Sequence, residues 1–213
     1  MIKKLKDLIF NNFLLIFCIY YFTIFLDATS LEIDYPVIEL ISKIIRYAMY
    51  LLFFIRLIIV LPYYKEDIKE NKWRQKTSLV KITYVILFIL VISLILNFII
   101  TKNKRMIFLI LVLLSAYKMD YKKIIKATMN LQIILTSILV LLSILGITQN
   151  YIVPRGNVSR YSFGFLYTTN LAQMIAFSSI LYLYINGSNI KYRELFIIQI
   201  MNVFTYFLTD SRT

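Results

Sequence analysis

Residues 37–62 read VIELISKIIRYAMYLLFFIRLIIVLP, an apolar run that is long enough to cross a lipid bilayer. A hydrocarbon core of about 30 Å needs roughly 20 apolar residues of helix. In lipid, a helix satisfies its backbone hydrogen bonds internally. The run therefore predicts a membrane-spanning helix, and it decides the expected class: an all-α, multi-pass integral membrane helix bundle.

The rest of the chain has the same character. Of its 213 residues, 60% are hydrophobic, and the mean hydropathy is +0.75, which is far above that of a soluble domain. The same length rule predicts about seven spans within one membrane domain, residues 1–213. They are residues 8–26, 37–62, 82–100, 106–119, 128–147, 170–186 and 195–209, with a long outer loop at residues 148–169.

The basic residues predict the orientation of these spans. Lys and Arg number 24 against 11 acids, and they lie between the apolar runs. This pattern fits topology signals and anionic lipid headgroups better than nucleic-acid binding. Basic residues concentrate in the segments that an N-terminus inside the cell would keep inside, with TKNKR, residues 101–105, as the exception. The chain is therefore expected to run N-in, C-out, with its first apolar run retained as a span.

The residue types exclude several kinds of chemistry. The chain has no His, and its single cysteine, Cys18, lies in the first apolar run. A zinc or iron site of the usual ligands, a disulfide framework and a Ser-His or Cys-His pair are therefore not expected. We expect no metal and no cofactor.

Three cations lie inside the second apolar run, where each costs about 2.5 to 3.5 kcal/mol on insertion scales. For Arg56 we favour snorkelling of the side chain to the inner surface. Arg46 shares a helix face with Lys43, which Glu39 precedes by one turn. Two interpretations of Arg46 remain open: a buried cationic patch that faces an anionic ligand, or a tilted interfacial segment at residues 37–46.

The outer loop, TQNYIVPRGNVSRYSFGFLYTT, differs from the rest of the chain in its polar residues. Arg155 and Arg160 offer two guanidinium groups, whose paired donors match phosphate oxygens. Residues 168–170, Thr-Thr-Asn, favour a helix N-terminus, which itself attracts anions. The loop therefore predicts an anion site, although contacts with lipid headgroups and an interfacial aromatic belt would explain the same residues without a ligand.

The stretch RYSFGFLYTTNLAQ, residues 160–173, resembles a known signature, Arg-x-Ser-x-Gly-Phe-x-His-Pro-Asn-x-x-Ala/Gly. It belongs to the Wzy-type polysaccharide polymerases and the related O-antigen ligases. Arg160, Ser162, Gly164 and Phe165 match in register, whereas Asn170 comes one position later than the Asn of the signature, after Thr168 and Thr169 in place of the His-Pro pair. The final YFLTDSRT resembles the later Thr-x-Ser-Arg-Thr/Ser segment of the family, at Thr209, Ser211, Arg212 and Thr213.

The resemblance implies a metal-independent, glycosyltransferase-type polymerase of the bacterial plasma (inner) membrane. Such an enzyme joins undecaprenyl-diphosphate-linked oligosaccharide repeat units on the outer face, for capsule, exopolysaccharide or O-antigen. Arg160 and Arg212 would then be catalytic, because they would stabilise the diphosphate leaving group. Binding of the diphosphate and sugars would fall to Arg155, Ser162, Gly164, Asn170 and Ser211, and we add Arg46 from its place in the membrane.

The implied partners are the lipid-linked oligosaccharide and membrane lipids, together with flippase and chain-length regulator proteins. The chain ends directly after the second motif, so it resembles the N-terminal half of such a polymerase, and alone it is expected to be inactive. Two other functions remain open. One is a flippase or transporter of lipid-linked oligosaccharides, and the other is a small non-enzymatic membrane protein.

Overall fold

The structure is a computed structural model that describes residues 12–69, 89, 92–93, 95–97, 99–101, 105–117, 119–155 and 158–209. The described residues are mostly helical, so the expected all-α class is confirmed. Two helical segments, Pro36–Pro62 and Tyr121–Ile144, are long and apolar enough to cross a membrane, and the apolar helix Phe13–Asp27 is shorter. Seven spans and their orientation stay predictions.

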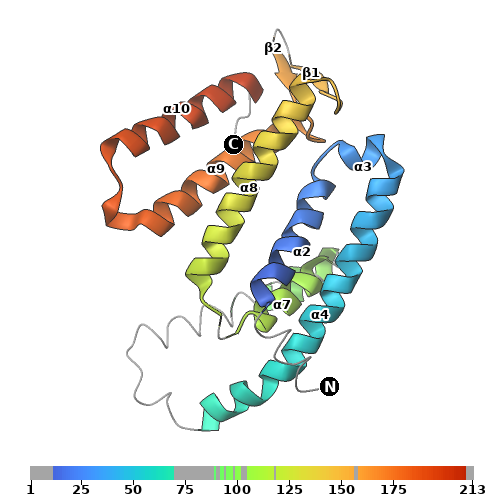
Figure 1. Ribbon diagram of the computed structural model, residues 1–213, viewed down its shortest axis with the longest axis vertical. Coiled ribbons are helices and arrows are strands. Elements are labelled where there is room, and N and C mark those ends of the chain that lie inside the picture. Colours follow the sequence, from blue (N-terminus) through green and yellow to red (C-terminus); the bar gives the residue numbers. More distant parts are fainter. Residues whose placement is uncertain are drawn as a thin grey trace. The chain divides into compact units, whose positions relative to one another are not determined.

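The chain forms two compact units. One combines Met1–Phe13 with Tyr47–Met119, and it contains α7 (Arg105–Ser115) and the later part of α4 (Pro36–Lys69). The other combines Leu14–Arg46 with Asp120–Thr213. Its elements are α2 (Phe13–Asp27) from Leu14 on, α3 (Leu31–Asp34), the start of α4, α8 (Tyr121–Ile144), β1 (Ile152–Arg155), β2 (Val158–Tyr161), α9 (Thr168–Asn186), the 3-10 turn Gly187–Asn189 and α10 (Tyr192–Thr209) (Figure 1).

The helix bounds differ from the expected runs where polar residues intervene. The run expected at 106–119 ends at Ser115, and the chain then turns through Ala116. The Asp120 side chain accepts a hydrogen bond from the Lys122 backbone N–H at 3.0 Å, so α8 begins well before the expected residue 128. Of the run expected at 82–100, residues 82–88, 90–91, 94 and 98 lie outside the described residues.

Helix α4 is continuous from Pro36 to Lys69. Residues 37–46 therefore belong to the same helix as the apolar residues that follow them. Which part of this helix lies at the membrane interface is not fixed by its continuity, so the interpretation of residues 37–46 as a tilted interfacial segment stays a prediction.

In the larger unit, α8 packs on α9, and α9 packs on α10 as an antiparallel neighbour (Figure 1). A core of Phe25, Leu139, Phe165 and Leu171 joins α2, α8, α9 and the outer loop. Hydrogen bonds also link α2, α8 and α9. The buried Gln132 side chain accepts one from the Tyr21 hydroxyl and donates one to the Met174 carbonyl at 2.6 Å. Such bonds hold helices together where the surroundings are apolar.

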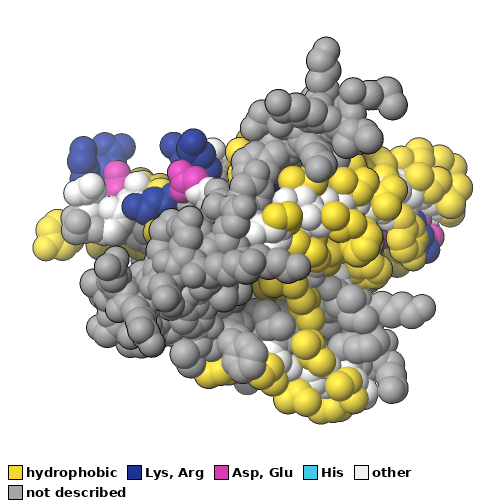
Figure 2. All heavy atoms as spheres, turned by 90° about the horizontal axis from the view of Figure 1, so that it is seen from below, with side chains coloured by type: hydrophobic (Ala, Val, Ile, Leu, Met, Phe, Trp, Pro, Cys, Tyr) yellow, Lys and Arg dark blue, Asp and Glu magenta, His cyan; other side chains and the backbone are white. Residues whose placement is uncertain are grey.

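The outer sides of the helices are apolar. Hydrophobic side chains cover much of the described surface in Figure 2, and Lys and Arg occupy only a small part of that view. On α4, for example, Val37, Leu40, Ile44 and Leu51 are each at least 60% exposed. Soluble monomeric proteins rarely expose so much contiguous apolar surface to water, so these faces support a membrane setting.

Candidate functional site

The outer loop is built on a two-stranded hairpin. Strands β1 and β2 pair antiparallel, with Val153 opposite Arg160. The chain then turns at Ser162, whose backbone N–H donates to the Tyr151 carbonyl at 3.0 Å, while its hydroxyl accepts from the Tyr151 N–H at 2.8 Å. Ser162 is fully buried. This side chain therefore closes the base of the hairpin.

Gly164 is required at its position by both conformation and space. Its φ is +83°, a region that L side chains rarely adopt. A Cβ there would lie 2.9 Å from Thr148 Oγ1 and 3.1 Å from Leu139 Cδ1. The preceding Phe163 also has a positive φ, 50°, which marks a strained turn. The Gly of the motif thus lets the loop lie directly on α8.

Residues 28–30 pair with residues 162–170, and we call these two segments together the outer seam. The Leu166 N–H donates to the Ala28 carbonyl at 3.0 Å, and the Ser30 N–H donates to the Gly164 carbonyl at 2.8 Å. Thr29 and Phe165 form the antiparallel bridge between these bonds, and neither is exposed. Beneath the seam, the Phe165 ring packs edge-on against Phe25 at 5.8 Å.

The start of α9 differs from the sequence expectation. The N-cap is Tyr167, and no side chain caps the helix, so Thr168 is already its first residue and is buried. The Asn170 amide donates to the Ala28 carbonyl at 3.3 Å. Ser162, Gly164 and Asn170, which we predicted to bind substrate, therefore have clear structural roles in building the seam.

Arg160 joins the loop to the end of α10. Its Nε donates to the backbone carbonyl of Thr209 at 3.0 Å, and the side chain is partly buried. Thr209 is the last residue of α10 and the first residue of the second motif. Ser211 and Arg212 lie outside the described residues, and the structure describes only the backbone of Arg155, in β1. The bond uses Nε, so the two terminal nitrogens of the guanidinium are not part of this contact.

An apolar groove of about 620 Å³ runs along α8, α9 and α10. At one end it is lined by Leu141, Leu171 and Leu208, the last of which adjoins the Thr209 carbonyl that binds Arg160. At the other end it is lined by Ile133, Tyr182 and Ile197. Arg160 does not line the groove itself but binds the carbonyl of Thr209, the neighbour of the lining residue Leu208.

Arg46 lies in a compact ionic cluster with α2 and α3. Its terminal nitrogens each donate to the Asp27 carboxylate at 2.5 Å, and Nη2 also donates to the Thr23 carbonyl at 2.8 Å and to Ser42 Oγ at 3.0 Å. Glu32 lies 3.9 Å from the same nitrogen. The Arg46 side chain is only 13% exposed. The cationic patch with Lys43 that we considered is not formed, because Lys43 binds Glu39 instead.

Glu32 occupies an unfavourable place in this cluster. Burial raises the pKa of its carboxyl above the ordinary value, and the neighbouring Asp27 raises it further. Hydrogen bonding to Ser42 and the charge of Arg46 lower the pKa, but not enough to offset these effects. Protonation of Glu32 therefore relieves repulsion between the two carboxylates.

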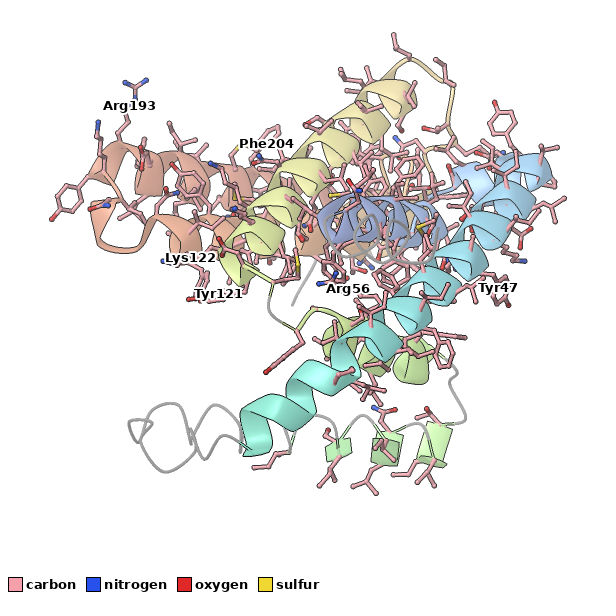
Figure 3. The ribbon with its side chains drawn as sticks, turned by 60° about the horizontal axis from the view of Figure 1, so that its bottom comes forward. Tyr47, Arg56, Tyr121, Lys122, Arg193 and Phe204 are labelled. Carbon is pink, nitrogen blue, oxygen red and sulfur yellow. The ribbon has the colours of Figure 1, made fainter. Side chains whose placement is uncertain are left out.

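Arg56 belongs to the other unit, and the expectation that it snorkels is wrong. Its side chain is fully buried, with Nε donating to the Ser115 carbonyl at 2.7 Å and the guanidinium 4.6 Å from the centre of the Phe13 ring (Figure 3). The carbonyl at the end of α7 and the aromatic face supply the partners that lipid headgroups would otherwise provide. Arg56 is thus held inside the protein.

Sequence reasoning missed Asp27 and Glu32 as partners of Arg46. The signal was present in the acidic segment DATSLEIDYP, residues 27–36, which contains no Lys or Arg. No family model, curated protein or solved structure matches the chain. The description of the site therefore rests on the sequence and the structure alone.

Proposed function

We propose that the chain is the motif-bearing part of a polymerase of undecaprenyl-diphosphate-linked oligosaccharide repeat units, acting at the outer face of a bacterial plasma membrane. The observation that carries this proposal is the hydrogen bond from Arg160 to Thr209. It brings the residue that opens the first motif beside the residue that opens the second. Two separate segments with the same implied chemistry thus meet at one place.

The proposed chemistry is positioning and charge stabilisation. The growing chain would be transferred from its diphosphate to a sugar hydroxyl of an incoming repeat unit. The diphosphate would leave with the electron pair of its bond to the sugar, and the proton of the hydroxyl would pass to solvent as the new glycosidic bond forms. Arg160, fixed through Nε, would direct its terminal nitrogens to the diphosphate oxygens, and Arg212 would add a second cation. Donors aimed at charge that develops during the reaction are among the largest catalytic contributions.

The groove along α8, α9 and α10 supports a lipid-linked substrate. It is apolar over its length, and its Leu208 end adjoins the Arg160 site. A prenyl chain lying in it would place the diphosphate near that guanidinium. The proposal includes seven spans with the N-terminus inside and the site outside, and it includes flippase and chain-length regulator proteins as partners.

The test is an Arg160→Ala substitution in the gene's own strain. We expect polymer to disappear and single lipid-linked repeat units to remain at the outer face, measured by gel analysis of polymer and by mass spectrometry of extracted lipids. Arg193→Ala is the matched control, because Arg193 points away from the turn before α10 (Figure 3). Normal polymer from Arg160→Ala would refute the proposal, and substrate trapped at the inner face would favour a flippase.

A further inference from the structure

Asp27, the carboxylate partner of Arg46, directly precedes the outer seam in the chain, although neither residue belongs to the seam. Asp27 is the last residue of α2, and Ala28, the first residue of the seam, follows it directly. The two terminal nitrogens of Arg46 donate hydrogen bonds to the two carboxylate oxygens of Asp27, each at 2.5 Å. A bidentate pair of this kind fixes orientation as well as distance.

The same guanidinium fixes the end of α2 from a second direction. Nη2 donates to the Thr23 carbonyl, one turn before Asp27, and Ser42 Oγ lies within hydrogen-bond distance of both Nη2 and that carbonyl. The last turn of α2 is thus bound to α4 through both its backbone and its carboxylate. The direction in which the chain leaves α2 follows from these bonds.

Residues 28–30 follow α2 directly. The loop forms hydrogen bonds with the backbone of these residues, which we call the template residues. The Ala28 carbonyl accepts two bonds, from the Leu166 N–H and from the Asn170 amide, and the Ser30 N–H binds the Gly164 carbonyl. These bonds hold both sides of the turn at residues 162–167. This turn directly follows β2, so it fixes the position of the end of β2, where Arg160 lies.

We propose that the Asp27–Arg46 ion pair is a positioning device that orients the Arg160 loop through the template residues 28–30. Arg46 then acts on the site without touching the substrate, which replaces our expectation that it binds substrate. The part of this inference that concerns catalysis rests on the proposed function. The part that concerns the order of the loop does not.

The experiment measures the protection of a buried loop position. Ser162→Cys, placed in a Cys18→Ala background, puts a single thiol at a fully buried site of similar size. In the detergent-solubilised protein a maleimide should label it slowly. Adding Arg46→Ala should raise the labelling rate at least tenfold, while Arg46→Lys, which keeps the charge but loses the fork, should raise it less.

Lys43→Ala is the matched control, because Lys43 also forms an ion pair on α4, one turn away, but with the exposed Glu39. It should leave the labelling rate unchanged. If Arg46→Ala prevents insertion of the protein, Asp27→Asn removes the same charge pairing with little change in shape. The reversed pair Asp27→Arg with Arg46→Asp should restore part of the protection.

The outcomes separate this inference from the proposed function. Unchanged labelling in Arg46→Ala, or in Asp27→Asn where that replaces it, would overturn the positioning role. Loss of polymer with unchanged labelling would likewise overturn it, since Arg46 would then act on the substrate directly. Faster labelling together with normal polymer from Arg160→Ala would keep the positioning role and refute the polymerase.

Discussion

The outer seam and the α9–α10 hairpin lie in the same unit but are held together in different ways. The seam is joined by backbone hydrogen bonds between segments far apart in the sequence, over a buried aromatic contact. The hairpin is mostly apolar, with an open groove on one side and the Asn202 to Ser179 bond, at 2.9 Å, as a polar link between its helices. The difference indicates that specific backbone contacts concentrate in the loop, while the helices leave an apolar groove open between them.

The largest expected effect on the seam comes from the Phe165→Ala substitution, which tests whether the seam is held more tightly than the hairpin. Phe165 is fully buried beneath the seam, so its removal leaves a cavity and should lower the free energy of unfolding by about 3 to 5 kcal/mol. Phe204→Ala is the control, because Phe204 lines the groove and is 62% exposed. Thermal unfolding in detergent should show a much smaller loss for Phe204→Ala, and similar losses would contradict the contrast.

A second test uses two glycines whose φ angles are both positive. Gly164 and Gly146 both have positive φ, but a Cβ would collide with Thr148 and Leu139 only at Gly164. Gly164→Ala should therefore cost about 2 to 3 kcal/mol, from backbone strain and overpacking together. Gly146→Ala should show only the strain, about 1 kcal/mol. Equal shifts in unfolding midpoint would show that the close approach of the loop to α8 has no energetic weight.

The hairpin has its own test in Asn202→Leu, which removes the bond to Ser179 Oγ. Interhelical hydrogen bonds in membranes average about 0.6 kcal/mol, so the expected destabilisation is of that size. The measurement is again thermal unfolding in detergent. A loss as large as that from Phe165→Ala would mean that the hairpin depends on specific polar contacts as much as the seam does.

The smallest expected effect concerns pH and Glu32. Because its folded-state pKa is raised, protonation of Glu32 favours the folded state. This contribution is fully present below the ordinary Glu pKa and is lost as pH rises through the raised value. Stability should therefore increase on mild acidification from neutral pH.

Glu32→Gln should flatten this part of the pH profile and should be more stable than the native chain at neutral pH. Glu39→Gln is the control, since Glu39 lies in the exposed pair with Lys43. A pH profile of the unfolding midpoint that is identical in the native chain and in Glu32→Gln would exclude a role for Glu32.

Helices were the part of the fold that the sequence predicted well, because runs of apolar residues carry the signal by themselves. The seam had no such signal. Residues 28–30 and 162–167 are short and irregular, and their pairing depends on contacts between distant parts of the chain. Arg160 was found through motif spacing, but its partner, a backbone carbonyl, has no residue type that a sequence could reveal.

The two arginines of α4 show the same limit. The free-energy cost of placing a charge in lipid indicates that Arg46 and Arg56 need partners. That cost does not identify which groups the partners are. Arg46 is matched by a carboxylate on α2, while Arg56 is matched by a carbonyl and an aromatic ring. Both partners depend on how helices pack, which one apolar run does not specify.

The bond from Asn170 to the Ala28 carbonyl has a consequence for biosynthesis. The two residues are 142 positions apart, so the end of α2 lacks this partner until 142 further residues have been made. At roughly 5 to 20 residues per second, translation would take about 7 to 28 seconds to cover that interval. During that time the end of α2 would need a temporary partner, such as water at the membrane surface or an insertion factor.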